Sequence, residues 1–144
     1  MKLSTTQVWV RDQDEAVSFW TDRVGFEIKE DVTIPELGNF RWVTVGPKGD
    51  AGTAIVLMVV PGQPVMDDAT KSAVESLVAK GFATGLFFTT DDAQGEYDRL
   101  SAAGVEVLDK PMQQPYGLDF GFRDPSGNPI EVKGFARMES VFAG

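Results

Sequence analysis

The chain repeats one pattern of residues at a fixed distance of 79 positions. In both copies a strand-like apolar segment leads to an aspartate, an amphipathic segment follows, and a glycine precedes another strand-like segment. The matched residues are Asp12 and Asp91, Gly25 and Gly104, and Glu27 and Glu106, each pair 79 residues apart. Since 144 residues is an ordinary length for one domain, the repeat predicts two similar modules inside a single domain.

The residue pattern in each copy of the repeat predicts one short amphipathic helix. Asp12 and Asp91 stand where an N-cap belongs, with side chains that accept hydrogen bonds from free backbone N–H groups. Gly25 and Gly104 fit the left-handed position that follows a helix. Between these limits the apolar residues recur at helical spacing and are expected in the core. They are Ala16, Phe19, Trp20 and Val24 in the first copy, and Ala93, Tyr97, Leu100 and Ala103 in the second.

Strand-like segments follow both helices. They cover residues 27–32, 40–45 and 53–60 in the first copy, and residues 105–108, 118–123 and 129–133 in the second. The residues Asp124-Pro125-Ser126-Gly127 match a type I turn position by position. We therefore predict an α+β fold of two βαβββ modules. Module one covers residues 1–61, a linker with a short helix covers 62–81, module two covers 82–135, and a tail covers 136–144.

Composition and charge narrow the classes of function. The chain has no histidine and no cysteine, so it lacks disulfides, thiolate chemistry and the commonest metal ligand. A formal net charge of −9 disfavours nucleic acid and anionic membranes as partners, although it suits a cationic ligand. The longest apolar run, residues 54–60, is far too short to span a bilayer. The first residues show no signal-peptide pattern, so we expect a cytoplasmic protein.

Three segments carry a resemblance to a known family. They are Val8-Trp9-Val10-Arg11-Asp12, the stretch Ala16–Glu27 with its Phe19-Trp20 and Gly25-Phe26-Glu27, and the ending Tyr116-Gly117…Phe120–Glu131 with Asp124-Pro125-Ser126-Gly127-Asn128. With the repeat, they make the chain similar to the vicinal oxygen chelate superfamily, which includes glyoxalase I, extradiol dioxygenases and bleomycin-resistance proteins. The resemblance implies a half-open, cup-shaped mixed sheet, with helices on the outer face and a pocket inside the cup.

The resemblance also implies where a metal would bind. Metalloenzymes of this family place ligands on the first and last strands of each module, and the matching positions are Thr5, Leu57, Gly85 and Glu131. Only Glu131 is a strong ligand, whereas transition-metal sites normally use three or four such groups. We therefore expect no tightly bound metal and no cofactor. Metal-dependent glyoxalase or dioxygenase activity is not expected.

Alternation of side chains along the strands predicts the lining of the cup. The predicted lining is largely apolar and aromatic with a few polar groups, which is the usual composition of a small-molecule site. Its members are Thr5, Gln7, Trp9, Phe40, Trp42, Leu57, Gly85, Phe87, Phe120, Phe122 and Glu131. Two alternatives remain open: the aromatic residues fill a collapsed cup without a ligand, or Glu131 is solvated or paired with Arg41 or Arg123.

Three functions follow from this lining. The first is a protein that binds a small aromatic or cationic molecule without a tightly bound metal. The second is a metal-independent or weakly metal-assisted lyase or isomerase, with Glu131 as general base and Tyr116 as proton donor. The third is a dimeric interaction protein without a ligand. The resemblance implies a homodimer, and the exposed strand edges of a half-open cup give a physical reason for pairing.

Overall fold

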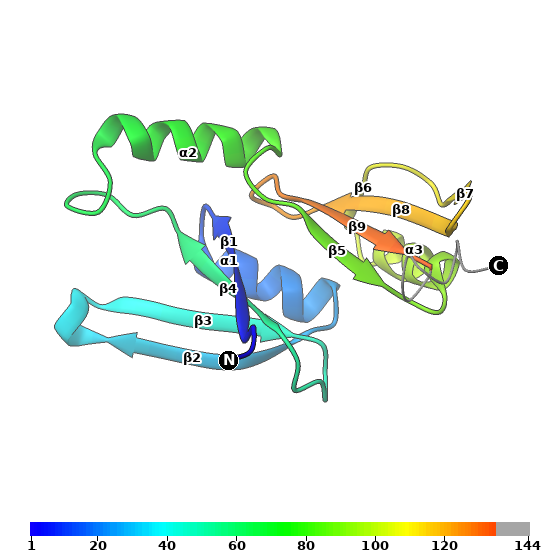
Figure 1. Cartoon of the computed structure of the whole chain (residues 1–144), viewed down its shortest axis with the longest axis horizontal. Helices are drawn as coiled ribbons and strands as arrows, with labels where there is room; N and C mark the ends of the chain where they lie inside the picture. Colours follow the sequence, from blue (N-terminus) through cyan, green and yellow to red (C-terminus); the bar gives the residue numbers. More distant parts are fainter. Residues whose placement is uncertain (135–144) are drawn as a thin grey trace.

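Two β-sheets lie side by side in the computed structural model, which describes residues 1–134 (Figure 1). The first sheet has the strand order β1-β4-β3-β2 and contains β1 (Thr5–Val10), β2 (Glu27–Ile34), β3 (Phe40–Gly46) and β4 (Ala54–Val59). The second has the order β5-β9-β8-β6, with β7 paired to β8. It contains β5 (Leu86–Thr89), β6 (Glu106–Val107), β7 (Met112–Gln114), β8 (Gly117–Arg123) and β9 (Pro129–Lys133).

The two sheets repeat one topology, which confirms the predicted α+β fold. In each sheet the first strand runs parallel to the last, β1 to β4 and β5 to β9. The other strand pairs are antiparallel. The short strand β7 was not predicted and is an addition to module two. Residue 135 and the predicted tail at 136–144 lie outside the described residues.

Each α-helix follows an aspartate N-cap, and a glycine with positive φ follows each helical segment. The helical segments are α1 (Gln13–Ser18), which continues as a π-helical turn over Phe19–Arg23, α2 (Asp68–Lys80), α3 (Ala93–Ala102), and a 3₁₀ turn at Pro35–Leu37. The side chain of Asp12 accepts from the backbone N–H of Glu15 at 2.7 Å, as predicted. The helix-ending glycines Gly25 and Gly104 have φ of +90° and +79°. Among the described residues, no helix is long and apolar enough to cross a membrane.

The predicted N-cap of the second module is wrong by one residue. Asp92, not Asp91, accepts from the backbone N–H of Gly95 at 2.9 Å. The backbone N–H of Asp92 donates in turn to the hydroxyl of Thr90 at 3.2 Å, which holds the cap residue in place. The helix therefore starts one residue later than an offset of 79 predicts.

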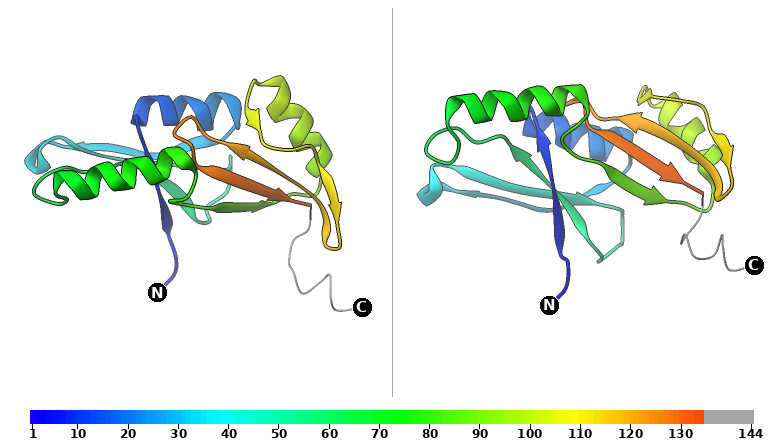
Figure 2. Two further views of the ribbon diagram at one scale, coloured as in Figure 1. Left: turned by 90° about the horizontal axis from the view of Figure 1, so that it is seen from above. Right: turned by 45° about the horizontal axis from the view of Figure 1, so that its top comes forward.

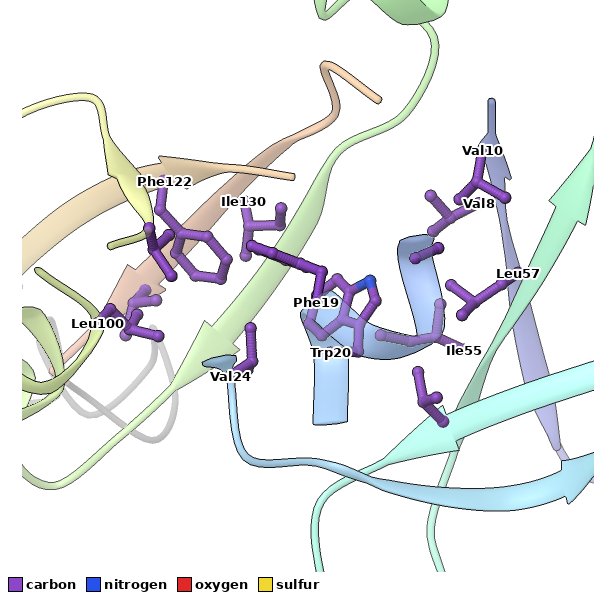
Figure 3. Close-up of a cluster of buried hydrophobic side chains, with 14 of the residues drawn as sticks. Val8, Val10, Phe19, Trp20, Val24, Ile55, Leu57, Leu100, Phe122 and Ile130 are labelled. Carbon is purple, nitrogen blue, oxygen red and sulfur yellow. The ribbon is translucent and has the colours of Figure 1, made fainter. Parts of the chain in front are cut away.

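One hydrophobic core serves both sheets. Helices α1 and α3 lie on the same side of the two sheets (Figure 2), and the strand residues facing them are buried together (Figure 3). The indole of Trp20 is fully buried, and its ring centroid lies 5.2 Å from that of Phe26, 6.2 Å from Phe88 and 6.4 Å from Phe122. Since Trp20 belongs to module one and Phe88 and Phe122 to module two, this aromatic cluster joins the modules.

The turn between β8 and β9 also connects the modules. The Asp124 carboxylate accepts from the backbone N–H groups of Ser126 at 3.0 Å and Asn128 at 2.8 Å, which stabilises the predicted turn. The Asn128 side chain then donates to the carbonyl of Trp9 at 2.8 Å, and the Ser126 hydroxyl accepts from the N–H of Arg11 at 3.0 Å. The turn therefore binds the end of β1 and sets the position of module two against module one.

Candidate functional site

The face of the first sheet opposite the core carries a row of apolar side chains. The register pairs Trp9 with Met58, and Val32 with Trp42. Because alternate residues of a strand point to opposite faces, these side chains lie on the face opposite the buried Val8. Both tryptophans are partly exposed, and Val32 is 51% exposed. This open face of module one also carries three other predicted cup residues, Thr5, Gln7 and Phe40.

A row of hydrogen-bonding groups lies beside the apolar row. Gln7 and Thr44 both pair with Val56, and Thr44 also pairs with Glu30. Gln7 and Glu30 are exposed, and Glu30 accepts a long hydrogen bond of 3.4 Å from the indole N–H of Trp42. The hydroxyl of Thr44 is buried and has no hydrogen-bond partner among the described residues. The open face of module one therefore offers polar contacts next to an aromatic surface.

The open face of the second sheet contains a cavity of about 440 Å³ with a carboxylate in its lining. The register places Phe87, Glu131 and Gly121 next to one another across β5, β9 and β8. Gly121 leaves room for the carboxylate, because a Cβ there would lie 3.2 Å from Oε1 of Glu131. The ring of Phe87 is 70% exposed. The cavity is lined by Gly85, Leu86, Phe87, Tyr116, Asp119, Pro129, Glu131 and Lys133.

The surroundings of Glu131 favour its neutral form. Burial raises the pKa of Glu131, and the nearby carboxylates of Asp109 and Asp119 raise it further, while Lys133 lowers it. Within the described part of the chain, the side-chain carboxylate of Glu131 forms no hydrogen bond and no ion pair. The ammonium of Lys133 lies 3.8 Å from the Asp119 carboxylate and 4.5 Å from the ring centroid of Tyr116. Glu131 is therefore a half-buried carboxylate whose charge is not neutralised by a direct contact.

The two arginines proposed as partners of Glu131 bind elsewhere. Arg41 forms ion pairs with Asp14 at 2.7 Å and Asp31 at 2.9 Å. Arg123 donates to the carbonyl of Gly127 at 3.3 Å. The alternative in which Glu131 is paired with Arg41 or Arg123 is therefore wrong for the described residues.

Three predicted cup residues lie in the core instead. Leu57 pairs with Val8 and is fully buried, pointing toward α1 (Figure 3). Phe120 packs edge-on against Tyr97 of α3 at 5.6 Å, and Phe122 packs against the aromatic cluster. The assignment of Leu57 to the cup was wrong because β4 carries apolar side chains on both faces, so alternation alone did not fix which face is open. The assignment of Phe120 and Phe122 was wrong by one residue, because in β8 the open face carries Asp119, Gly121 and Arg123, which alternate with the two phenylalanines.

The comparison with known proteins agrees with this architecture. The family model of the Glyoxalase/Bleomycin resistance protein/Dioxygenase superfamily matches residues 2–132. The chain belongs to this superfamily.

Two proteins of known structure and one curated protein have sequences similar to this chain. UcmS2 is 37% identical with a TM-score of 0.85, and the match covers 94% of this chain and 98% of UcmS2. TnmS3, an antibiotic binding protein from Streptomyces sp. CB03234, is 30% identical with a TM-score of 0.70, covering 92% and 94% of the two chains. The uncharacterized protein YurT of Bacillus subtilis (strain 168) is 34% identical over 133 residues, which is 92% of this chain and 98% of YurT.

The residues at the superfamily's metal positions do not fit a tightly held metal. Thr5, Gly85 and Glu131 lie on the open faces, but Leu57 lies in the core and has no donor atom. No group of three or more carboxylates converges to hold a metal ion among the described residues. One carboxylate and one hydroxyl form a poor ligand set for a transition metal. The lack of a tightly bound metal stays a prediction from these donors.

Tyr116 lines the same cavity as Glu131. Its hydroxyl donates to the Asp119 carboxylate, and this hydrogen bond is the first cause of the raised pKa of Tyr116. Lys133 donates to the same hydroxyl at 3.5 Å. The proton of Tyr116 is therefore held by Asp119 in this arrangement, and a catalytic role of Tyr116 or Glu131 stays a prediction.

Sequence reasoning missed four polar or small residues of the second open face. These are Asp109, Asp119, Gly121 and Lys133. Two signals could have found Asp119 and Gly121. The position 79 residues after Trp42 is Gly121, not Phe122, and Asp119, Gly121 and Arg123 alternate with buried phenylalanines along β8.

Proposed function

We propose that the protein binds a small aromatic or cationic molecule on its open sheet faces, without a tightly bound metal. The observation that carries this proposal is the partly exposed row of Trp9, Met58 and Trp42 on one face, combined with the cavity next to Glu131 on the other. Apolar and aromatic surfaces with a few placed polar groups are typical of small-molecule sites. The similarity to TnmS3, an antibiotic binding protein, supports the binding of a small molecule.

We expect binding at the proposed site to be measurable by calorimetry with a flat, uncharged aromatic probe. Anthracenemethanol should bind the wild-type protein with a calorimetric signal, and Trp42→Ala should bind it about tenfold more weakly or worse, because stacking area is lost. Affinity should be unchanged after dialysis against EDTA. The matched control is Phe82→Ala, which removes an exposed ring outside the open faces. Absence of binding by wild type, or equal affinity in Trp42→Ala, would contradict the proposal; loss of binding after EDTA would contradict metal independence.

The same proposal includes a homodimer in the cytoplasm, in which open faces of two chains cover one another. The outer edges of β1, β2 and β5 have no strand partner among the described residues, and such edges normally need cover. Exposed apolar side chains on the same faces, including Val32, Phe87 and Met112, add area for an interface. Sedimentation equilibrium should give about twice the chain mass of 15.7 kDa at micromolar concentration. A monomer mass throughout that range would argue against the dimer.

A further inference from the structure

We infer that Glu131 is the counter-ion for a protonated amine of the ligand, so that the bound molecule joins an ammonium group to a flat apolar body. This inference rests on the proposed binding function and names its ligand class. Glu131 is the one strong ligand present at the superfamily's metal positions, and in this inference it binds an ammonium group instead of a metal ion.

The position of Glu131 suits a small cationic group. Its carboxylate lies in the lining of the cavity, and Gly121 next to it on β8 provides no side chain that would cover it. Gly85 also lines the cavity, and a Cβ there would meet only the ring of Phe87, at 3.5 Å. The exposed ring of Phe87 stands beside the carboxylate on β5. An ammonium group in this space would contact both a carboxylate and an aromatic ring, which attracts cations.

The hydrogen bonds around Glu131 leave this carboxylate available. Asp109 accepts from the backbone N–H of Gly121 at 2.7 Å, and Asp119 accepts from the hydroxyl of Tyr116. Glu131 alone among these three carboxylates makes no such contact with the described residues. A protonated amine brings three N–H donors and a positive charge, so it would supply what Glu131 lacks. Around Glu131 the two further carboxylates of Asp109 and Asp119 outnumber the single ammonium of Lys133, so the surroundings carry a net negative charge that favours a cationic over an anionic ligand.

A single available carboxylate suits an ammonium group better than a metal ion. A divalent or transition metal needs several converging ligands, and no group of three carboxylates converges among the described residues. An ammonium group needs one carboxylate and a polarisable surface. The apolar body of the ligand would then lie against the exposed ring of Phe87, which is next to Glu131 in the sheet register.

Three probes with one ring system separate the effect of charge from that of stacking. Anthracenemethylamine, anthracenemethanol and anthracenecarboxylate differ only in the attached group. For the wild type we expect calorimetry to show the amine binding at least about tenfold more tightly than the alcohol, and the carboxylate most weakly. In Glu131→Gln the affinity for the alcohol should be kept, while the difference between amine and alcohol should fall to about twofold or less.

Glu36→Gln is the matched control, because it removes the same charge from an exposed turn at Pro35–Leu37 and should keep the full preference for the amine. Equal binding of amine and alcohol by wild type, or a preference that survives in Glu131→Gln, would overturn the inference and leave the proposed binding function intact. Absence of binding by all three probes would overturn both. Thermal unfolding of Glu131→Gln should match or exceed that of wild type, since folding disfavours the ionised form of Glu131.

Discussion

Replacing Gly127 by alanine should lower the free energy of unfolding by about 3–5 kcal/mol, and Tm by roughly 10–15 °C. Gly127 has φ of +110°, a conformation that side-chain-bearing residues rarely adopt. A Cβ there would lie 2.6 Å from the carbonyl oxygen of Val78 and 2.7 Å from that of Ala79. Because both contacts are with the backbone of α2, the helix would have to move away from the β8–β9 turn. Urea and thermal unfolding measure this loss.

The control for this prediction is Gly49→Ala. Gly49 also has a positive φ, +73°, but no atom lies within 4 Å of the position of its added Cβ. Only the backbone cost applies there, about 1 kcal/mol. Similar losses in the two variants would show that α2 does not pack on the turn in solution. A glycine therefore follows Asp124-Pro125-Ser126 for two reasons. The turn requires a positive φ at this position, and the backbone of α2 lies too close to leave space for a Cβ.

Replacing Trp20 by alanine should destabilise the fold by about 3–5 kcal/mol. The indole is fully buried and packs against rings from both modules, so its loss leaves a cavity where the two sheets share their core. Trp20→Phe should cost less, below about 2 kcal/mol, because it keeps a ring and removes an indole N–H that has no acceptor among the described residues. Both values come from chemical unfolding followed by circular dichroism.

Trp42→Ala should affect ligand binding more than stability, in contrast to Trp20→Ala. Trp42 lies on the open face and is only partly buried, so its loss should cost about 1 kcal/mol of stability while it weakens binding of the neutral probe. Trp20→Phe should keep probe binding close to wild type, because Trp20 lies in the core and not on the open face. If Trp20→Ala were as stable as Trp42→Ala, the aromatic cluster would not hold the modules together.

Local sequence determined the elements of this protein. The Asp12 cap, the left-handed glycines Gly25 and Gly104 and the turn at Asp124–Gly127 all depend on hydrogen bonds and backbone angles within a few residues. Such features can be predicted because the interacting groups are neighbours in the chain. The repeat then indicated that the elements form two modules of one kind.

Tertiary structure alone decided which face of each strand is open. In β4 apolar residues occupy both faces, so Leu57 could be assigned to the core only once its register with Val8 was known. In β8 the alternation of Asp119, Gly121 and Arg123 with the phenylalanines already separated the two faces, and the contacts of Phe120 and Phe122 then showed which face is the core. The surroundings of Glu131 depend likewise on groups from separate strands and loops, Asp109, Asp119 and Gly121 among them. The amino-acid sequence by itself therefore determined the two modules and the single strong donor at the metal positions. The packing of the sheets decided what surrounds that donor, because register and burial arise only from contacts between distant parts of the chain.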